Sequence, residues 1–265
     1  MSAAALALML LPAAADPPLR TAPAFTDLVP SVSLPPSFQD RLIYYQSFDS
    51  PDGAPEVNQT GAVPNALELQ PAGMRGRCAL GAQDTGLHLN SEAFSPHRPF
   101  TASFWWALSE DAKIDGIFGL FHLAGARGFI SHFSRGQGEW CALQRPAGIL
   151  QVYYLDGIAN VNGIYEGNLL GKLDLRAGVW HHTAIVIRGA SLTEVYTDGA
   201  KVFETRNNGR DFAPEDSLHD LRIGSFWGTR AFIDEAMVLQ RALSAEEIAD
   251  YVTAIRQMAA VGYPQ

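Results

Sequence analysis

The chain has 265 residues, of which 47% are hydrophobic and 18% are charged, so it holds enough apolar material for one substantial core. Its formal net charge is -9, and its isoelectric point is near 5.2. No block of Lys or Arg interrupts this acidic balance, which excludes a phosphate-neutralising surface and makes nucleic acid a poor partner.

An apolar run opens the chain. Residues 3–11 are followed by Pro12 and three alanines before Asp16. This order is typical of the apolar region and small-residue cleavage site of an export signal, which we place at residues 1–15. The run is too short to span a bilayer, and no Lys or Arg precedes it. We expect a secreted, periplasmic or cell-surface protein, and the alternative is a frayed apolar N-terminus.

A proline-rich segment follows over residues 16–40. Its prolines are Pro17, Pro18, Pro23, Pro30, Pro35 and Pro36. Proline lacks an amide hydrogen and disfavours both helix and sheet, so this segment is predicted to be an extended linker. The rest of the chain shows no internal repeat, and we expect one domain over residues 41–258 with a tail at 259–265.

Strand-length apolar runs recur through this domain between Gly, Pro, Asn and Asp residues. They are residues 42–48, 66–69, 87–89, 100–108, 117–123, 128–133, 149–154, 180–188, 192–196, 221–223 and 232–239. In the run 100–108, the residues Phe100, Ala102, Phe104, Trp106 and Leu108 share one face, because side chains alternate along a strand. That face is predicted to form the core.

Two local signals complete the secondary structure. Asp198-Gly199 lies between two apolar runs and predicts a tight hairpin turn. Ser244 to Glu247 form a capping box that predicts the start of a helix. The helix would bury a stripe made of Ile248, Tyr251, Val252 and Ile255. Many strands and one terminal helix favour an all-β, two-sheet antiparallel sandwich.

Several segments resemble laminin-G-like, concanavalin A-like jelly-roll domains. The last third of those domains is similar to residues 180–184, 195–199, 221–224, 232–239 and 241–248, and earlier strands are similar to 44–49, 76–80 and 100–105. The similarity covers about residues 41–255. It implies a jelly-roll sandwich, and domains of this kind bind sugars, bind proteins or pack against other domains.

The resemblance does not imply a reaction. Related folds include endoglucanases whose paired acids lie two positions apart on one strand, where nucleophile and acid can reach one glycosidic bond. This chain has no such pair. Asp234-Glu235 are adjacent and would face opposite sides of a strand, and Glu246-Glu247 open the helix. We therefore predict that the protein is not an enzyme, and a polysaccharide hydrolase or lyase is the disfavoured alternative.

A structural calcium ion is a hypothesis that the resemblance implies. Members of this superfamily often hold one at the rim of the sandwich, and Asp49, Asp52 and Asp234 lie in the matching elements. The alternative is that Asp49 and Asp52 shape a turn and Asp234 accepts backbone amides.

The histidines do not predict a metal site. His181 and His182 are adjacent and face opposite ways on a strand, so they cannot grip one ion together. His122 and His132 could share a solvent face of neighbouring strands, but no Cys or acid lies around them with metal-site spacing.

A sugar platform is the second hypothesis. On the run 149–154, Leu150 and Val152 are predicted to point inward, which leaves Gln151 and Tyr153 outward. An amide and an aromatic ring there could bind a sugar, and Trp140 and Trp227 could join them. The alternative is that the aromatic residues fill the core.

An oxidising compartment would also favour a disulfide between Cys78 and Cys141, against the alternative of two buried thiols. The sequence thus predicts a non-catalytic recognition module for carbohydrate or for an extracytoplasmic protein. A structural subunit of a larger extracytoplasmic assembly is the alternative.

Overall fold

The computed structural model describes residues 34, 36–59, 64–65, 68–81, 85–90, 98–112, 117–124, 129–134, 149–154, 163–167, 176–188, 192–206, 220–226 and 230–260. The predicted export signal, most of the predicted linker and residues 261–265 lie outside this part of the chain.

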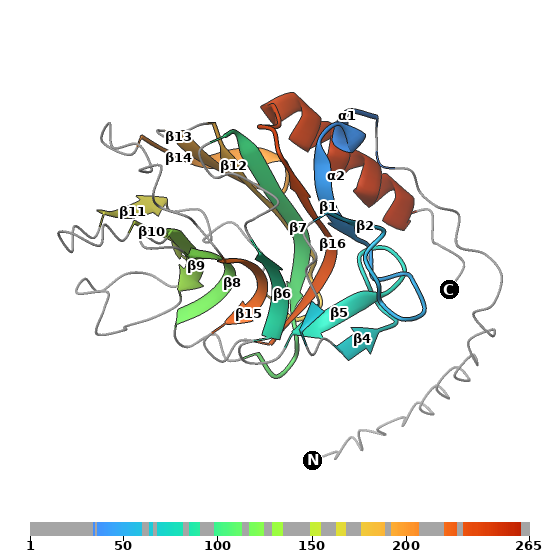
Figure 1. Cartoon of the computed structure of the whole chain (residues 1–265). Coiled ribbons are helices and arrows are strands. Elements are labelled where there is room, and N and C mark those ends of the chain that lie inside the picture. The colour runs from blue at the N-terminus through green and yellow to red at the C-terminus, as the bar shows by residue number, and fades with distance from the viewer. Residues whose placement is uncertain are drawn as a thin grey trace, which may run out of the picture.

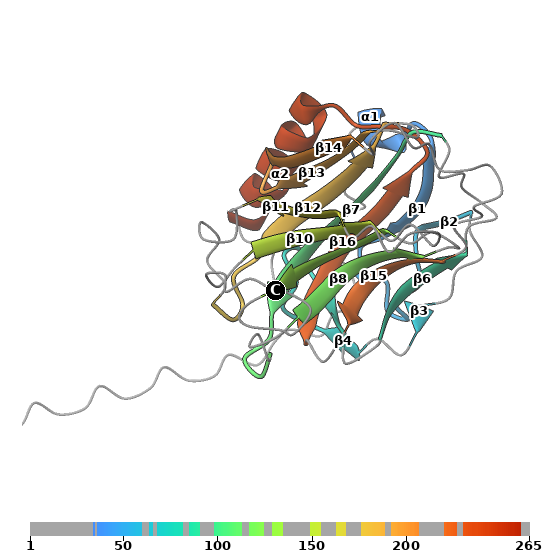
Figure 2. The ribbon, with the colours of Figure 1, turned by 90° about the vertical axis from the view of Figure 1, so that its left-hand side faces the viewer.

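The described strands form two antiparallel sheets (Figure 1). Sheet A is built, in spatial order, from β14 (Ala200–Arg206), β13 (Leu192–Thr197), β12 (His181–Ile187), β7 (Phe100–Leu108), β16 (Ala231–Leu239), β1 (Leu42–Gln46) and β2 (Val57–Asn58), with β5 (Cys78–Gly81) beside β16 and β4 (Glu68–Gln70) beside β5. Sheet B is built from β11 (Gly163–Gly167), β10 (Ile149–Tyr154), β9 (Phe129–Ser134), β8 (Ile117–Ala124), β15 (Asp220–Phe226), β6 (Thr85–Asn90) and β3 (Pro64–Asn65). The two sheets stack face to face, which confirms the predicted sandwich (Figures 1 and 2).

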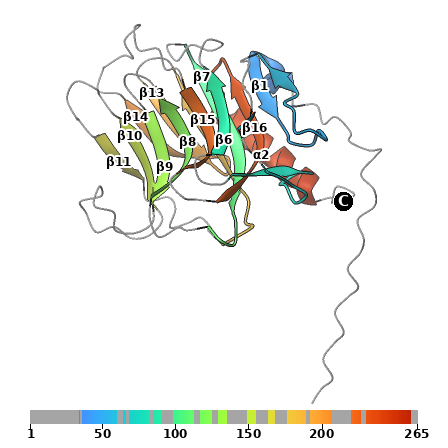
Figure 3. The ribbon, with the colours of Figure 1, turned by 60° about the horizontal axis from the view of Figure 1, so that its bottom comes forward.

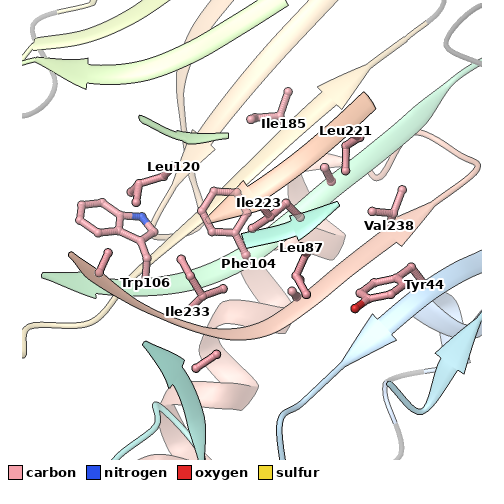
Figure 4. Close-up of a cluster of buried hydrophobic side chains, with 14 of the residues drawn as sticks. Tyr44, Leu87, Phe104, Trp106, Leu120, Ile185, Leu221, Ile223, Ile233 and Val238 are labelled. Carbon is pink, nitrogen blue, oxygen red and sulfur yellow. The ribbon is translucent and has the colours of Figure 1, made fainter. Parts of the chain in front are cut away.

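Apolar side chains from both sheets fill the space between them (Figure 4). All of β7 is buried. Its residues Phe100, Ala102, Phe104, Trp106 and Leu108 belong to the inter-sheet core, as the alternation predicted. Leu87, Leu221 and Ile223 meet them from sheet B. Side chains alternate along a strand, so the residues between these core positions lie on the opposite face of each sheet.

On sheet A, those intervening residues are covered by two helices, α1 (Pro36–Gln39) and α2 (Ala245–Ala260). Trp105, Val186 and Met237 form a second buried cluster with the helices, outside the sandwich. Figure 3 shows α2 lying across the strands of sheet A on the side away from sheet B. The residues under the helices on this face of sheet A are therefore buried.

The helix α2 forms as predicted. The Ser244 amide donates to the Glu247 carboxylate at 2.8 Å, and the Glu247 amide donates to the Ser244 hydroxyl at 3.1 Å, which is the expected capping box. The stripe made of Ile248, Tyr251, Val252 and Ile255 is buried.

The helix α1 lies inside the predicted linker and shifts the boundary of the folded region. Leu34 and Phe38 are buried in the cluster under α2, and the Phe38 ring stacks on the Tyr251 ring with centroids 4.8 Å apart. Pro36 is the first residue of α1, where the missing amide costs no hydrogen bond, and the burial of Leu34 and Phe38 stabilises the segment against α2.

Candidate functional site

The outer face of sheet B is the face that no described helix covers (Figure 2). Arg222 of β15 is half-buried and lies between Leu221 and Ile223, which are both in the inter-sheet core. Because side chains alternate along a strand, Arg222 occupies a position on the face away from that core.

Cross-strand pairing extends this position into a row across the sheet. Arg222 is paired with His88 of β6 on one side and with His122 of β8 on the other. His122 is paired with Ile130 of β9, which is in turn paired with Tyr153 of β10. Directly opposed residues in antiparallel strands share a face, so this row lies on the outer face of sheet B.

A second row runs parallel to the first. His132 of β9 is paired with Gln151 of β10, and Gln151 is paired with Glu166 of β11. His132 and Gln151 are each two residues from a member of the first row, so both rows occupy the same face. The register therefore places Gln151 and Tyr153 on one face, and it adds His122 and His132 to it. Trp140 and Trp227 lie outside the described residues.

The second candidate region is the rim of the sandwich, where β16 changes neighbours. Its first half pairs with β5, and its second half pairs with β1. Between the halves, the pairing of β16 with β7 is irregular from Asp234 to Met237, and Glu235 has a φ of 50°. This is a β-bulge, and the segment 73–77 fills the space beside it.

The bulge corrects the expectation that Asp234 and Glu235 face opposite sides of a strand. Asp234 Oδ2 accepts the backbone amide of Arg75 at 3.0 Å, and Glu235 Oε1 accepts the Arg75 side-chain Nε at 2.8 Å. Both acids therefore reach the same loop residue. The extra residue of the bulge breaks the alternation on which the prediction relied.

Glu235 belongs to a network under α2. Its carboxylate forms an ion pair with Arg75 at 2.6 Å and accepts the Tyr45 hydroxyl at 2.8 Å, and Arg75 also donates to Tyr45 at 2.9 Å. Burial raises the pKa of Glu235 to about 7, although Arg75 and the Tyr45 hydroxyl work against that. Burial lowers the pKa of Arg75, but the neighbouring Glu235 carboxylate raises it. The net shift is upward.

Asp234 has a less well compensated charge than Glu235, because no side chain among the described residues donates a hydrogen bond to it. It is fully buried, and its Oδ1 accepts the Glu235 amide at 2.8 Å. Burial raises its pKa well above the usual range, and the neighbouring charges of Glu235 and Asp49 add to the rise. Asp49 accepts the Arg77 amide at 2.8 Å, and burial raises its pKa too. The rim thus concentrates negative charge that its own residues only partly neutralise.

Two glycines make room for these carboxylates. A Cβ at Gly73 would lie 2.7 Å from Asp234 Oδ2 and 2.5 Å from the Arg77 carbonyl oxygen. A Cβ at Gly76, where φ is 67°, would collide with the Asp49 carboxylate. The segment therefore brings hard oxygen atoms into a confined cradle, the donor type that calcium prefers.

The oxygen atoms of this cradle are of the type that binds calcium. Among the described residues, no three Asp, Glu, His or Cys side chains form a group that could hold a metal ion, so an ion here would rely on Asp49, Asp234 and backbone carbonyls. Asp52 has a separate structural role. Its carboxylate accepts the Ala54 amide at 3.0 Å in an exposed turn, which lowers its pKa.

The adjacent histidines both have protein partners. His181 Nδ1 lies 2.9 Å from the Asp198 carboxylate, and His182 Nε2 lies 2.8 Å from the Ser103 hydroxyl. His182 is fully buried, and burial lowers its pKa to about 3. These contacts give both histidines structural roles. Asp198 and Gly199 form the predicted turn with φ of 53° and 84°, and Gly199 packs on Ala249 of α2.

Cys78 is buried and carries a free thiol in the structure, and burial raises its pKa. Cys141 lies outside the described residues, so the disulfide between them stays a prediction.

The sequence interpretation did not single out Arg75, Tyr45 or Glu56. Glu56 accepts both the amide and the hydroxyl of Ser47, beside Asp49. Arg75 meets Glu235 across 160 positions, and Tyr45 meets it across 190. The only local signal was a pair of basic residues, Arg75 and Arg77, before the strand at 78–81, and it does not identify their partners.

Solved structures with a similar fold come from binding domains. The binding domain of Paraclostridial Mosquitocidal Protein 1 has a TM-score of 0.61 and 16% identity over 81% of this chain and 52% of that one. Domain 4 of AbnA, an extracellular GH43 arabinanase from Geobacillus stearothermophilus solved with arabinotriose, has a TM-score of 0.57 and 18% identity over 80% of this chain and 98% of that one. The botulinum neurotoxin serotype D binding domain has a TM-score of 0.60 and 11% identity over 82% and 52%.

This chain spans about half the length of the two toxin fragments. At these identities, the likeness shows the fold alone. No curated protein is similar to the chain. Among the described helices, none has the length and apolar character needed to cross a membrane.

The sequence profile of the concanavalin A-like lectin/glucanases superfamily, in its laminin-G form, matches residues 81–249. That segment runs from the end of β5 through the bulge of β16 to the first turn of α2. It includes both outer rows of sheet B and, of the rim acids, Asp234 and Glu235. The chain therefore belongs to the concanavalin A-like lectin/glucanases superfamily.

Proposed function

We propose that this protein is a non-catalytic module that binds carbohydrate outside the cytoplasm, on the outer face of sheet B. The main support for this proposal is a difference between the outer faces of the two sheets. Much of the outer face of sheet A is covered by α1 and α2, which pack on its apolar side chains. That of sheet B has Arg222, Tyr153 and Gln151 in its cross-strand rows, and no described helix covers it.

The chemistry of these rows suits a sugar. An aromatic ring can stack on the apolar face of a pyranose or furanose, and amide and guanidinium groups hydrogen-bond its hydroxyls. The similar AbnA domain was solved with arabinotriose, which supports the same ligand class for this chain.

The non-catalytic part of the proposal is supported by the acid pairs. Asp234 and Glu235 are fully buried, and Glu247 is engaged in the cap of α2. Neither pair is placed to flank a glycosidic bond, which hydrolysis requires.

Retention of the purified chain on a panel of insoluble and immobilised polysaccharides tests the function. Saturable retention on at least one glycan is expected, and Tyr153→Ala should weaken it by about tenfold, as expected from the loss of a stacking residue. Lys201→Ala, at an exposed position of sheet A, serves as the matched control and should bind normally. No retention on any glycan would overturn the proposal and favour a protein-docking subunit.

We further propose a structural calcium ion held by Asp49 and Asp234 at the rim. Such an ion would neutralise two carboxylates whose pKa values are raised by burial. Calcium at 100 times its dissociation constant should stabilise the fold by about 2.7 kcal/mol relative to chelator. Asp234→Asn should abolish the calcium response, whereas Asp52→Asn should keep it. An unchanged melting temperature with calcium and with chelator would contradict the ion.

A further inference from the structure

We propose that α2 and sheet A enclose a binding site for one structural water molecule, formed by Trp105, His182 and Tyr251. The site lies on the side of sheet A away from sheet B, where α2 crosses the strands (Figure 3). It is separate from the proposed carbohydrate site, so neither proposal depends on the other. Its role is to join the helix to two strands of the sheet through hydrogen bonds.

The three side chains come from three elements and are mutual neighbours. Trp105 of β7 and His182 of β12 are direct cross-strand partners, and their ring centroids lie 5.2 Å apart. The Tyr251 ring of α2 meets the His182 ring edge-on, with centroids 5.5 Å apart. Burial raises the pKa of Tyr251 well above its usual range, and the Trp105 indole is near enough to the hydroxyl to oppose that rise. The three rings therefore surround one small region between helix and sheet.

Each ring carries one polar atom that lacks a hydrogen-bond partner among the described residues. The three atoms are Trp105 Nε1, His182 Nδ1 and the Tyr251 hydroxyl oxygen. Trp105 and His182 are 0% exposed and Tyr251 is 1% exposed, so bulk solvent does not reach these atoms. A buried polar group without a partner is costly, and ordered water is the usual partner where the protein offers none. Three such atoms around one region point to a shared ligand.

The donor and acceptor properties of these atoms define that ligand. The Trp105 indole N–H can only donate, so the ligand must accept a hydrogen bond. The Tyr251 hydroxyl can donate or accept. His182 Nε2 lies 2.8 Å from the Ser103 hydroxyl, and the remaining Nδ1 donates or accepts according to which ring nitrogen carries the proton. A water molecule satisfies every combination, since it both donates and accepts.

An ion does not fit the same place. The indole N–H points its positive end at the ligand, which disfavours a cation. An anion would need a positive charge, but burial lowers the pKa of His182 to about 3, so the ring is neutral near pH 7. The Arg256 guanidinium, 5.7 Å from the Trp105 ring centroid, is already paired with Asp198 at 2.8 Å. Water, which typically makes about three hydrogen bonds in a buried site, is the remaining ligand.

A high-resolution crystal structure of the intact chain tests the site. We expect one peak of electron density at about 2.7–3.2 Å from each of the three atoms. Trp106 is the matched control, because its equally buried Nε1 already donates to Thr183 Oγ1 at 3.0 Å, and no peak should lie beside it. Absence of the peak, or a direct hydrogen bond between Trp105 Nε1 and the Tyr251 hydroxyl, would overturn the proposal.

The melting temperature gives a second test, in which the sign of the change decides. If water binds the Tyr251 hydroxyl, Tyr251→Phe removes a hydrogen bond and should lower the melting temperature by about 2–4 °C. If the hydroxyl is instead buried without a partner, the same substitution relieves it. A melting temperature that stays unchanged or rises in Tyr251→Phe would therefore overturn the site.

Discussion

The bulge at Asp234 and Glu235 shows how one irregular residue can reassign two side chains. A regular strand would have sent the two acids to opposite faces, whereas here both meet Arg75. The chain accommodates this with a positive φ at Glu235, at a position without glycine. Strain of this kind persists only where the surrounding contacts fix it. The contacts of Arg75 and Tyr45 with Glu235 are the contacts that do so.

Removing the Arg75 guanidinium should destabilise the fold, because the Glu235 carboxylate is buried beside it. We expect Arg75→Met to lower the free energy of unfolding by about 3–5 kcal/mol, because Glu235 would be left buried without its ion-pair partner. The double variant Arg75→Met with Glu235→Gln should recover most of this loss, since no charge remains to be compensated. Urea unfolding measures both. Equal destabilisation of the single and double variants would show that the ion pair is not the cause.

Comparison of Gly76 with Gly178 separates the effect of the Asp49 contact from that of backbone strain. Gly76 and Gly178 have φ of 67° and 75°, but a Cβ at Gly178 meets nothing within 4 Å. Gly178→Ala should cost about 1 kcal/mol through backbone strain alone. Gly76→Ala should cost at least about 1 kcal/mol more, because its Cβ would collide with Asp49. Thermal unfolding of the two variants compares them directly, and equal losses would remove the role of the Asp49 contact.

Tyr45 of β1 and Tyr251 of α2 are both buried between sheet A and the helix, but their hydroxyl groups differ in their partners. The Tyr45 hydroxyl binds Glu235 and Arg75, whereas the Tyr251 hydroxyl has no hydrogen-bond partner among the described residues. Tyr45→Phe should therefore cost about 1–3 kcal/mol, and Tyr251→Phe, which loses only the proposed water molecule, should cost less, about 1 kcal/mol. Chemical denaturation measures the pair. A larger loss for Tyr251→Phe would contradict this order.

Among the elements, α2 was the easiest to predict and its N-terminal cap is the easiest to test. Ser244→Ala removes the hydroxyl that accepts the Glu247 amide and should lower the free energy of unfolding by about 1 kcal/mol. Thr253→Ala, at an exposed position within the same helix, should leave stability unchanged or raise it slightly. Circular dichroism during thermal unfolding reports both. A loss that is no larger for Ser244→Ala would contradict the importance of the cap.

The elements also show what local pattern can and cannot predict. Alternation in 100–108 identified the core face of β7, and helical spacing identified the buried stripe of α2, because both depend on neighbours in sequence. The pairing of Arg222 with His88 and His122 depends on three strands far apart in the chain. The cross-strand rows of sheet B and the Arg75 network therefore needed the structure, since no local pattern encodes a register between distant strands.

At the scale of the whole molecule, buried titratable groups give the stability a predictable dependence on pH. The folded chain holds the Glu235 proton up to about pH 7, whereas the unfolded chain releases it near its ordinary value of 4.5. In that window the folded state binds more protons, so stability falls as pH rises. Asp234 acts in the same direction. His182 acts in the opposite direction below its ordinary 6.5, because only the unfolded chain takes up its proton.

Above about pH 4.5 the two acids together outweigh His182, so stability falls as pH rises towards 8. We expect the free energy of unfolding to fall by about 1–2 kcal/mol between pH 6 and pH 8 in chelator. Glu235→Gln and Asp234→Asn should each flatten this decline, whatever their effect on absolute stability. Denaturant titrations across the pH range supply the slopes. Stability that rises from pH 6 to pH 8 would show that the two acids are ionised throughout.

The position of β16 in sheet A has a consequence for how the chain is made. It lies between β7 and β1, and Leu42 of β1 pairs with Leu239 near its end. The two halves of sheet A cannot join until this late strand has left the ribosome, so β1 waits for most of synthesis without β16 and has only β2 beside it. A nascent chain in that condition stays threadable, which is compatible with the export that its first residues predict.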